Sequence, residues 1–377
     1  MGFTLNALES DVRDRAAATA KLVAPHAHVW DEANELTDEL RAIMADSGLT
    51  RLMVPRQYGG ETEQLDPLLI ALVREQLMGA SSAADALFAL QGIGSNAITT
   101  VGTEEQKQQW LPKVASMEIL TAVALTEPQT GSDLRSITTS LTQRDGQLVV
   151  NGAKSFISNA PYADLYCVLV KEDVGLSMVL IPKETPGVSF SATPDLGAPH
   201  VIGELEFTDV VLEESARLGE PGKGLEVALA SLAVFRVTVA AAAVGLAEAA
   251  LATATRHAQQ RQNHGKPLAR IGAVAALLAD AKVDLESARW VTYHAAWSAR
   301  GDATAAMAAT SLAKVAATEA ADRVTDRCVQ VMGRFGLVRG SDIERYAREA
   351  RPMRIYEGAN EVLRLTIARD LASEYAS

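Results

Sequence analysis

The chain has 377 residues, with 35 lysines and arginines against 47 aspartates and glutamates, so its formal net charge is −12. This length excludes a small disulfide-stapled fold and leaves room for two or three domains. Hydrophobic residues make up 48% and charged residues 22%, which is typical of folded, soluble proteins and not of disordered chains. The acidic balance disfavours nucleic acid and anionic membrane surfaces as partners, because both repel a negatively charged protein.

The cysteines and the start of the chain indicate a reducing compartment. Cys167 and Cys328 form no C-x-x-C pair, so they predict neither a disulfide framework nor a thiolate metal site. Residues 1–6 show no basic stretch followed by an apolar one, and position 6 is not the Ser or Thr that myristoylation prefers. We therefore expect a cytoplasmic protein without an export or lipid signal.

The first 120 residues have the apolar spacing of helices. Asp66-Pro67 places a cap residue before a first-turn proline, which predicts a helix start. Thr103 and Gln106 predict a capping box at the start of a further helix, which we expect to stop near Pro112.

Between residues 121 and 211 the pattern changes to short β-branched runs separated by turn dipeptides. No segment of helical length lies between these runs, so antiparallel pairing in a small barrel or sandwich is favoured over a parallel sheet. The predicted strands lie around residues 148–150, 156–158, 165–170, 177–181 and 204–207.

Long helical patterns return after residue 224 and predict an antiparallel bundle. The most apolar stretch, residues 227–254, is read as a buried bundle helix and not as a membrane span, because Arg236 and Glu248 interrupt it. The expected helices cover residues 226–261, 272–299 and 303–332, with shorter ones from Ser341 and Ala359. The predicted domains are residues 1–120, 121–225 and 226–377.

Several segments match known functional motifs, but their sequence context does not support those functions. Residues 92–97 spell G-x-G-x-x-G, but they lie in a helical region without a preceding strand, so we interpret them as a helix irregularity. Residues 311–314 spell S-x-x-K without its companion motifs, and we expect a polar pair on a solvated helix face. His26 and His28 are too few ligands for a metal site, and no nucleophile motif is present, so we expect no metal.

Two segments could form a ligand site. Thr126 to Asp133 gathers small and hydroxyl residues able to present donors to a ligand, although such a loop is also typical of ordinary Asx and Ser turns. Ile355 to Asn360 places Glu357 beside Gly358, which equally fits a helix start with an acidic first turn. The spacing alone leaves both interpretations open.

Taken together, five ordered segments resemble the acyl-CoA dehydrogenase family of flavoenzymes along nearly the whole chain. They are similar to that family's G-T-E-E-Q-K…L-P, T-E-P-x-x-G-S-D, G-x-K-x-W-I-T-N, R-x-x-F-G-K-P-L and I-Y-E-G-T…I-A-R elements. In this chain they are residues 102–112, 126–133, 152–159, 261–268 and 355–369. The resemblance implies an α+β multidomain fold with an N-terminal all-α domain, a middle antiparallel β-barrel and a C-terminal four-helix bundle.

The resemblance also implies a reaction. Members oxidise a saturated acyl thioester to the trans-2-enoyl thioester with FAD as acceptor, and Glu357 corresponds to the base that removes the α-proton. The thioester carbonyl is then polarised by the backbone N–H of Glu357 together with a flavin ribityl hydroxyl, and the β-hydrogen leaves as hydride to flavin N5. Some branches place the base in the bundle helix before the motif arginine, but here Phe235 precedes Arg236.

The site residues follow from the same resemblance. Arg236 corresponds to an arginine that meets the adenine end of CoA, with a surface ion pair as the alternative, and Ser132, Tyr356 and Gly358 are further expected substrate contacts. The expected FAD contacts are Leu125, Thr126, Gly131, Ser132, Phe156 and Ser158, and, toward the FAD of a neighbouring subunit, Arg261, His264, Gln330, Gly333, Arg334, Ala359 and Glu361.

Some of these positions depart from the family pattern. Phe156 replaces Trp and Ser158 replaces Thr, which preserves a flat apolar wall and a hydroxyl. His264 replaces Phe, and Ala359 replaces Thr. Arg334 stands where a second glycine is usual, and we expect it to pair with the FAD pyrophosphate.

The resemblance leaves alternatives open. The substrate carrier is CoA or, as in secondary-metabolite pathways, an acyl carrier protein. A flavin oxidase or monooxygenase on the same fold and a non-catalytic helical interaction protein are the other classes. The expected electron acceptor is an electron-transfer flavoprotein, and the expected assembly is a homotetramer or homodimer.

Overall fold

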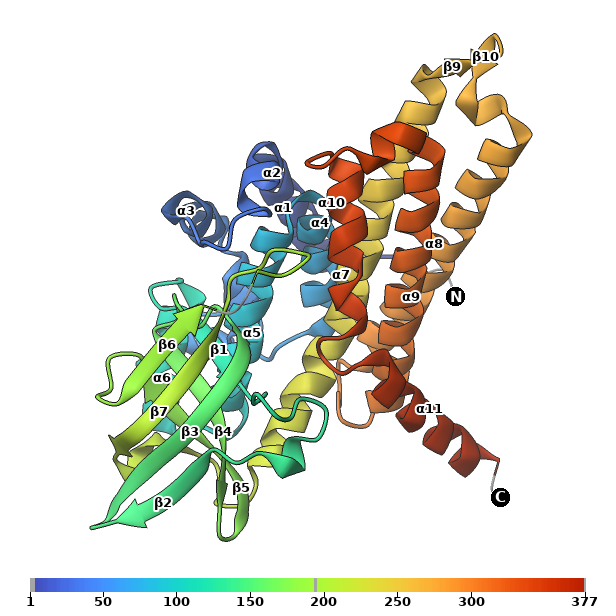
Figure 1. The fold of residues 1–377 in the computed structure, drawn as a ribbon. Coiled ribbons are helices and arrows are strands. Elements are labelled where there is room, and N and C mark those ends of the chain that lie inside the picture. The colour runs from blue at the N-terminus through green and yellow to red at the C-terminus, as the bar shows by residue number, and fades with distance from the viewer. Residues whose placement is uncertain (1–3, 193–194, 376–377) are drawn as a thin grey trace. The chain divides into compact units, whose positions relative to one another are not determined.

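Helices are the main elements up to residue 115, strands begin at residue 121, and long helices begin again at residue 224 (Figure 1). The computed structural model describes residues 4–192 and 195–375, so residues 1–3, on which the expectation about an N-terminal signal partly rests, lie outside it. The helices before the sheet are α1 (Ala7–Val23), α2 (Ala27–Trp30), α3 (Asp38–Ser47), α4 (Pro67–Ala80), α5 (Ser82–Val101) and α6 (Glu104–Ala115).

The strands form one mainly antiparallel sheet, in the order β6-β7-β3-β2-β4-β5-β8, with β1 paired to β4. Their bounds are β1 (Thr121–Ala124), β2 (Ser140–Arg144), β3 (Gln147–Ser158), β4 (Leu165–Glu172), β5 (Gly175–Pro182), β6 (Val188–Ala192), β7 (Ile202–Leu212) and β8 (Arg217–Leu218). The antiparallel expectation is confirmed for most pairs, but β1 runs parallel to β4, and β2 meets β4 in parallel at Ser140 and Lys171. β1 can lie beside β4 in this direction because β2 and β3 provide the long connection that a parallel pair needs.

The last part of the chain contains α7 (Gly224–Gln260), α8 (Gly272–Ser298), α9 (Met307–Met332), α10 (Asp342–Ala350) and α11 (Asn360–Glu374). Each agrees with a predicted helix to within a few residues. A small hairpin of β9 (Gln262–Asn263) and β10 (Lys266–Pro267) joins α7 to α8, and it was not predicted. Its two-residue turn has positive φ at both His264 and Gly265, as a type I′ hairpin turn requires.

The helix of the predicted capping box is longer than expected. Thr103 and Gln106 form the box at the start of α6 as predicted, but α6 continues past Pro112 to Ala115. The proline removes one helical hydrogen bond, yet its carbonyl still accepts the Ser116 N–H at 3.2 Å. Burial of Leu111 and Val114 outweighs that single loss.

By their internal contacts the described residues divide into two compact units, and each is described by itself. The bundle unit comprises residues 4–32, 67–85 and 233–375, and the sheet unit comprises residues 33–66, 86–192 and 195–232. Both units are discontinuous in sequence. The boundaries of three successive domains therefore remain a prediction from the sequence.

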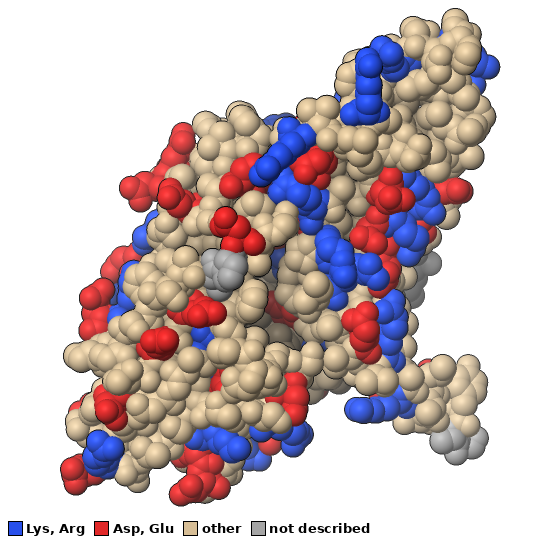
Figure 2. All heavy atoms as spheres, in the orientation of Figure 1, with Lys and Arg blue, Asp and Glu red and all other residues tan. Residues whose placement is uncertain are grey.

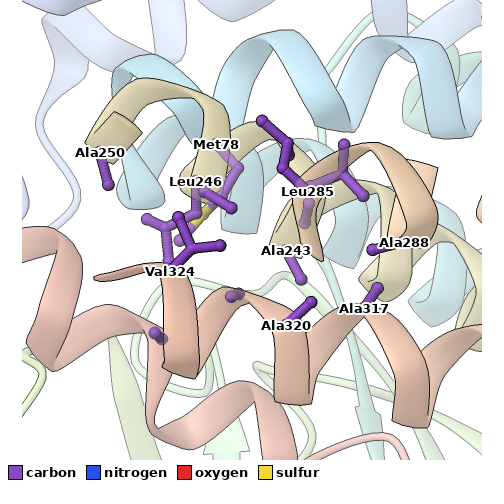
Figure 3. Close-up of a cluster of buried hydrophobic side chains, with 14 of the residues drawn as sticks. Met78, Ala243, Leu246, Ala250, Leu285, Ala288, Ala317, Ala320 and Val324 are labelled. Carbon is purple, nitrogen blue, oxygen red and sulfur yellow. The ribbon is translucent and has the colours of Figure 1, made fainter. Parts of the chain in front are cut away.

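The core of the bundle unit lies between α4, α7, α8 and α9 and consists largely of alanine. Figure 3 shows Ala243, Leu285, Ala317 and Val324 meeting there, and all four are fully buried or nearly so. Small side chains let the helices approach closely. One close approach is at Gly245 of α7, where an added Cβ would lie 1.9 Å from the carbonyl oxygen of Glu75 in α4.

Helix α7 is the one helix among the described residues that is long and apolar enough to cross a membrane. Its most apolar window is 78% buried. Residues 240–243 are completely buried within the bundle core, so the prediction of a buried helix is confirmed.

In the sheet unit, apolar side chains from β1 to β7 form a second core. The G-x-G-x-x-G spelling lies inside α5, away from any strand-to-helix turn. Gly94 is needed there for packing, because an added Cβ would lie 2.5 Å from Oγ1 of Thr121 in β1. The interpretation of this motif as structural is therefore supported.

On the face drawn in Figure 2, basic and acidic side chains lie interspersed. Many basic and acidic side chains of the bundle unit form ion pairs with one another. Arg354, for example, bonds to both Glu319 and Asp322.

Candidate functional site

The turn between residue 354 and helix α11 holds Glu357 in an unusual backbone conformation. Glu357 has φ = 55° and Gly358 has φ = 100°, so two successive residues lie in the left-handed region. That region is strained for a residue with a side chain. Two buried cations hold the turn: Arg236 Nε donates to the Glu357 carbonyl at 3.2 Å, and Lys314 Nζ donates to the Gly358 carbonyl at 2.8 Å.

The Glu357 carboxyl group is buried and incompletely paired. Its Oε2 atom has no hydrogen-bond partner among the described residues, and no carbonyl group described here accepts its backbone N–H. Burial raises the pKa of this carboxyl group, while the nearby cations Arg74, Arg236 and Lys314 act to lower it. Such a carboxylate combines raised basicity with a free lone pair.

Arg74 reaches this region from α4 as part of a buried ion pair. Its Nε and Nη2 atoms donate to the two carboxylate oxygens of Asp85 at 2.9 and 2.6 Å, and Nη1 donates to Thr238 at 3.0 Å. A guanidinium group held at three points is a fixed charge.

One expectation and one alternative about this part of the bundle unit are wrong. Ser311 and Lys314 are completely buried, so they do not form a polar pair on a solvated face. Arg236 is only 6% exposed and donates to Ser311 Oγ at 3.2 Å, so it is not in a surface ion pair. All three residues lie on the buried side of their helices.

In the sheet unit, the predicted ligand loop begins at the end of β1 on a buried ion pair. Lys154 Nζ donates to Glu127 Oε1 at 2.9 Å and to the Leu125 carbonyl at 3.1 Å. Burial acts to raise the pKa of Glu127, but hydrogen bonds from Thr139, Thr138 and Lys154 lower it to about 2. The loop is therefore anchored at its start, whereas Gly131 and Ser132 farther along are exposed.

Strand β3 presents the predicted ring-binding residues beside this loop. The Ser155 N–H donates to the Thr126 carbonyl at 3.0 Å. Phe156 has φ = 54° and lies in an irregularity of the β3–β7 pairing, and its side chain is 54% exposed. An exposed aromatic ring at a strained position indicates a functional surface.

Ser158 has a partner that the sequence analysis missed. His200 Nε2 lies 2.9 Å from Ser158 Oγ, and the His200 backbone N–H donates to Asn34 at 3.2 Å. Burial lowers the pKa of His200 to about 4, so its ring is neutral near pH 7. The sequence pattern could not indicate this contact, because His200 lies outside the predicted strands, in the connection before β7.

At the end of the bundle, a hollow of about 510 Å³ is lined by Arg261 and Phe335, among other residues. The guanidinium groups of Arg261 and Arg334 lie 5.8 and 5.1 Å from the centre of the Phe335 ring. Neither arginine has a carboxylate partner among the described residues. The two unpaired cations can therefore accept an anionic ligand.

The other expected contacts lie close to these groups in the chain. Gln330 is exposed on the last turn of α9, and Gly333 ends that helix with φ = 57°. Ala359 is the N-cap of α11, and Glu361 is exposed in its first turn. Tyr356 is 37% exposed.

The structure thus gathers the expected residues into three groups. Arg236, Glu357 and Gly358 meet in the bundle unit, Leu125, Thr126 and the start of the loop meet β3 in the sheet unit, and Arg261 and Arg334 share the Phe335 ring. Lys314, Arg74 and His200 were not predicted. The described residues hold no group of three His, Cys, Asp or Glu side chains that could bind a metal ion.

Comparisons with known proteins find similarity along nearly the whole chain. Residues 6–118, 122–210 and 222–372 match the family models for the N-terminal, middle and C-terminal domains of acyl-CoA dehydrogenase. An acyl-CoA dehydrogenase of Bacillus subtilis is 35% identical over 368 residues, covering 96% of each chain.

Solved structures extend the similarity to three dimensions. Butyryl-CoA dehydrogenase from Megasphaera elsdenii is 31% identical, with a TM-score of 0.93 over 98% of this chain and 100% of that one. A glutaryl-CoA dehydrogenase from Mycobacterium smegmatis, solved in complex with FADH2, is 25% identical, with a TM-score of 0.90 over 98% and 95% of the two chains. The chain therefore belongs to the acyl-CoA dehydrogenase family, whose members carry out flavin-dependent dehydrogenation of acyl-CoA.

Proposed function

We propose that this protein catalyses the FAD-dependent α,β-dehydrogenation of an acyl-CoA thioester, with Glu357 as the base that removes the α-proton. The observation that carries the proposal is the buried, incompletely paired carboxyl group of Glu357. Its carboxyl group is buried, its Oε2 atom is unpaired, and three cations surround it. The Oε2 atom accepts no hydrogen bond within the described chain and is available to a substrate.

The proton transfer makes specific demands that this residue meets. The α-C–H group of a thioester is a weak acid, so the base must be desolvated and held against it. In the proposed step the Cα–H bond breaks and the proton passes to the Glu357 carboxylate, while charge develops on the thioester oxygen. The unpaired N–H of Glu357 is a suitable donor to that oxygen.

FAD supplies the redox chemistry when it is bound, because its flavin ring accepts the hydride that leaves Cβ. Each unit, taken by itself, has features that suit part of such a ligand. In the sheet unit these are the exposed Phe156 ring, the Ser158 hydroxyl and a buried Asn159 Nδ2 atom without a partner among the described residues. In the bundle unit the unpaired Arg261 and Arg334 beside the hollow suit the pyrophosphate group.

CoA is the proposed carrier of the acyl group, and an acyl carrier protein is the alternative that the experiment tests. Arg236 was expected to meet the adenine end of CoA. Its Nε and Nη1 atoms instead donate to the Glu357 carbonyl and to Ser311 Oγ. We therefore propose that Arg236 lies near the reacting thioester group and not near the adenine of CoA.

A homo-oligomer, a tetramer or a dimer, is proposed as the working assembly. Helix α8 exposes Val283, Trp290 and Trp297, and α11 exposes Leu365 and Leu371, each by more than half. Such apolar faces are unfavourable in water and are suited to covering by a second copy. Light scattering on the purified protein tests this.

An electron-transfer flavoprotein is the proposed electron acceptor, and the cytoplasm is the proposed location.

The experiment that tests the proposed function is an anaerobic titration followed by visible absorption. The purified protein is mixed with a panel of short, branched and dicarboxylic acyl-CoA thioesters and then with acyl-carrier-protein thioesters. Bleaching of the flavin band with formation of the enoyl thioester supports the proposal and identifies the acyl class. Flavin that no thioester bleaches, or protein that retains no flavin, would contradict it.

A further inference from the structure

Lys314 is a completely buried lysine whose hydrogen bonds go to neutral oxygens. Its Nζ atom donates to the Gly358 carbonyl at 2.8 Å and to Asn360 Oδ1 at 3.0 Å. A buried ammonium group without a bonded carboxylate is costly. An apolar side chain of the same length would fill the same space at lower cost, so packing does not account for this residue.

The group that Lys314 holds is the turn of the proposed base. The two successive carbonyl oxygens of Glu357 and Gly358 each accept a hydrogen bond from a buried cation, Arg236 on one side and Lys314 on the other. Fixing both carbonyls fixes both peptide planes. The first of these planes contains the Cα atom of Glu357, so the direction of the Glu357 side chain depends on these donors.

Helix α9 supplies this support from positions one turn apart. Ser311 binds Arg236, Lys314 binds the turn, and Thr318 Oγ1 accepts from Asn360 Nδ2 at 3.0 Å. The three residues are completely buried and follow the spacing of one helix face. Asn360 also donates to Glu319 at 3.0 Å, which orients its Oδ1 atom toward Lys314.

Lys314 also contributes charge at the base. The charges of Arg74 in α4, Arg236 in α7 and Lys314 in α9 all act to lower the pKa of Glu357. Burial lowers the pKa of Lys314 to about 8, and Glu357, Glu361 and Glu319 act against this while Arg236 adds to it. The ammonium form therefore predominates near pH 7, where its charge favours the ionised carboxylate.

We infer that Lys314 is a positioning residue for the reaction: it holds the Glu357–Gly358 turn in its strained conformation and keeps the Glu357 carboxylate ionised. This inference rests on the proposed function, in which Glu357 is the base. Lys314 itself touches neither the substrate nor the cofactor in this role.

The test compares Lys314→Met, which removes the donor and the charge, with Lys314→Arg, which retains both. Lys282→Met is the matched control, because Lys282 is an exposed lysine of α8 paired with Glu286. Each protein is prepared with FAD. The rate constant of flavin reduction by saturating acyl-CoA is measured against pH, together with the protonation of Glu357 by infrared difference spectroscopy.

We expect the acid limb of the pH profile to move up by about one unit in Lys314→Met, because loss of a nearby cation raises the pKa of a carboxyl group. At a pH below both acid limbs the reduction rate should fall about tenfold, which corresponds to the same loss of ionised base, and the difference should shrink as the pH rises above them. Lys314→Arg should recover most of the wild-type profile, and Lys282→Met should match it. An unchanged acid limb in Lys314→Met would overturn the inference.

If Lys314→Met does not fold, Lys314→Gln replaces it, since the amide still donates but carries no charge. The Gln and Arg variants should then differ in their acid limbs, and equal limbs, or loss of the fold in both, would overturn the inference. The infrared titration of Glu357 needs no turnover. It therefore separates failure of this inference from failure of the wild-type protein to oxidise any thioester, which would contradict the proposed function.

Discussion

The ion pair beneath the predicted flavin loop allows a quantitative prediction. Lys154→Met removes the ammonium group and leaves Glu127 as a buried carboxylate without a countercharge. Breaking a buried ion pair in this way typically costs ~3–5 kcal/mol. Glu127 keeps donors from Thr138 and Thr139 at 2.7–2.9 Å, so we expect a loss near the lower end, about 3 kcal/mol.

Thermal unfolding of the sheet unit is the appropriate assay. At roughly 2 °C per kcal/mol for a long chain, the midpoint should fall by about 6 °C. FAD retention should weaken too, because Lys154 also holds the Leu125 carbonyl at the start of the loop. Lys171→Met, at an exposed lysine of β4, is the control and should leave both unchanged. A fall of less than about 2 °C in Lys154→Met would refute the reasoning.

Three further predictions follow from named contacts. The pKa of Glu127 lies near 2 against its ordinary value of 4.5, so about 3 kcal/mol of stability should be present above pH 4.5 and lost as the pH falls toward 2; an acid titration followed by circular dichroism that shows no loss would contradict this. Gly245→Ala would place a methyl group 1.9 Å from the Glu75 carbonyl and should destabilise the bundle unit by ~1–3 kcal/mol in urea unfolding, whereas Gly272→Ala, with open space around it, should not. Arg334→Ala should lower the flavin content of the purified protein, and full occupancy would show that Arg334 makes no contact with the pyrophosphate.

The order of helices and strands could be predicted from the sequence because its signals are local. The capping box at Thr103 and the proline after Asp66 mark helix starts that the structure contains. The end of α6 could not be predicted, because burial of Leu111 and Val114 overrides the proline. The parallel pairing of β1 with β4 depends on contacts distant in sequence, which no local pattern records.

The site was predictable only in part. A resemblance pointed to Glu357, but its orientation depends on Lys314, whose position on the buried face of α9 was misread as solvated. The alanines at positions 313, 317 and 321 were the available signal, since they mark that face as core. The contact of His200 with Ser158 left no such signal, because a loop residue carries no periodicity.

The most direct test of the central claim is anaerobic flavin reduction in Glu357→Gln compared with the wild type, at equal FAD content. The amide keeps the size of the side chain and removes its basicity. The account predicts that an acyl-CoA thioester bleaches the wild-type flavin rapidly, and that the variant is slower by ~10²–10⁴-fold. Bleaching of the variant at the wild-type rate would contradict the assignment of Glu357 as the base.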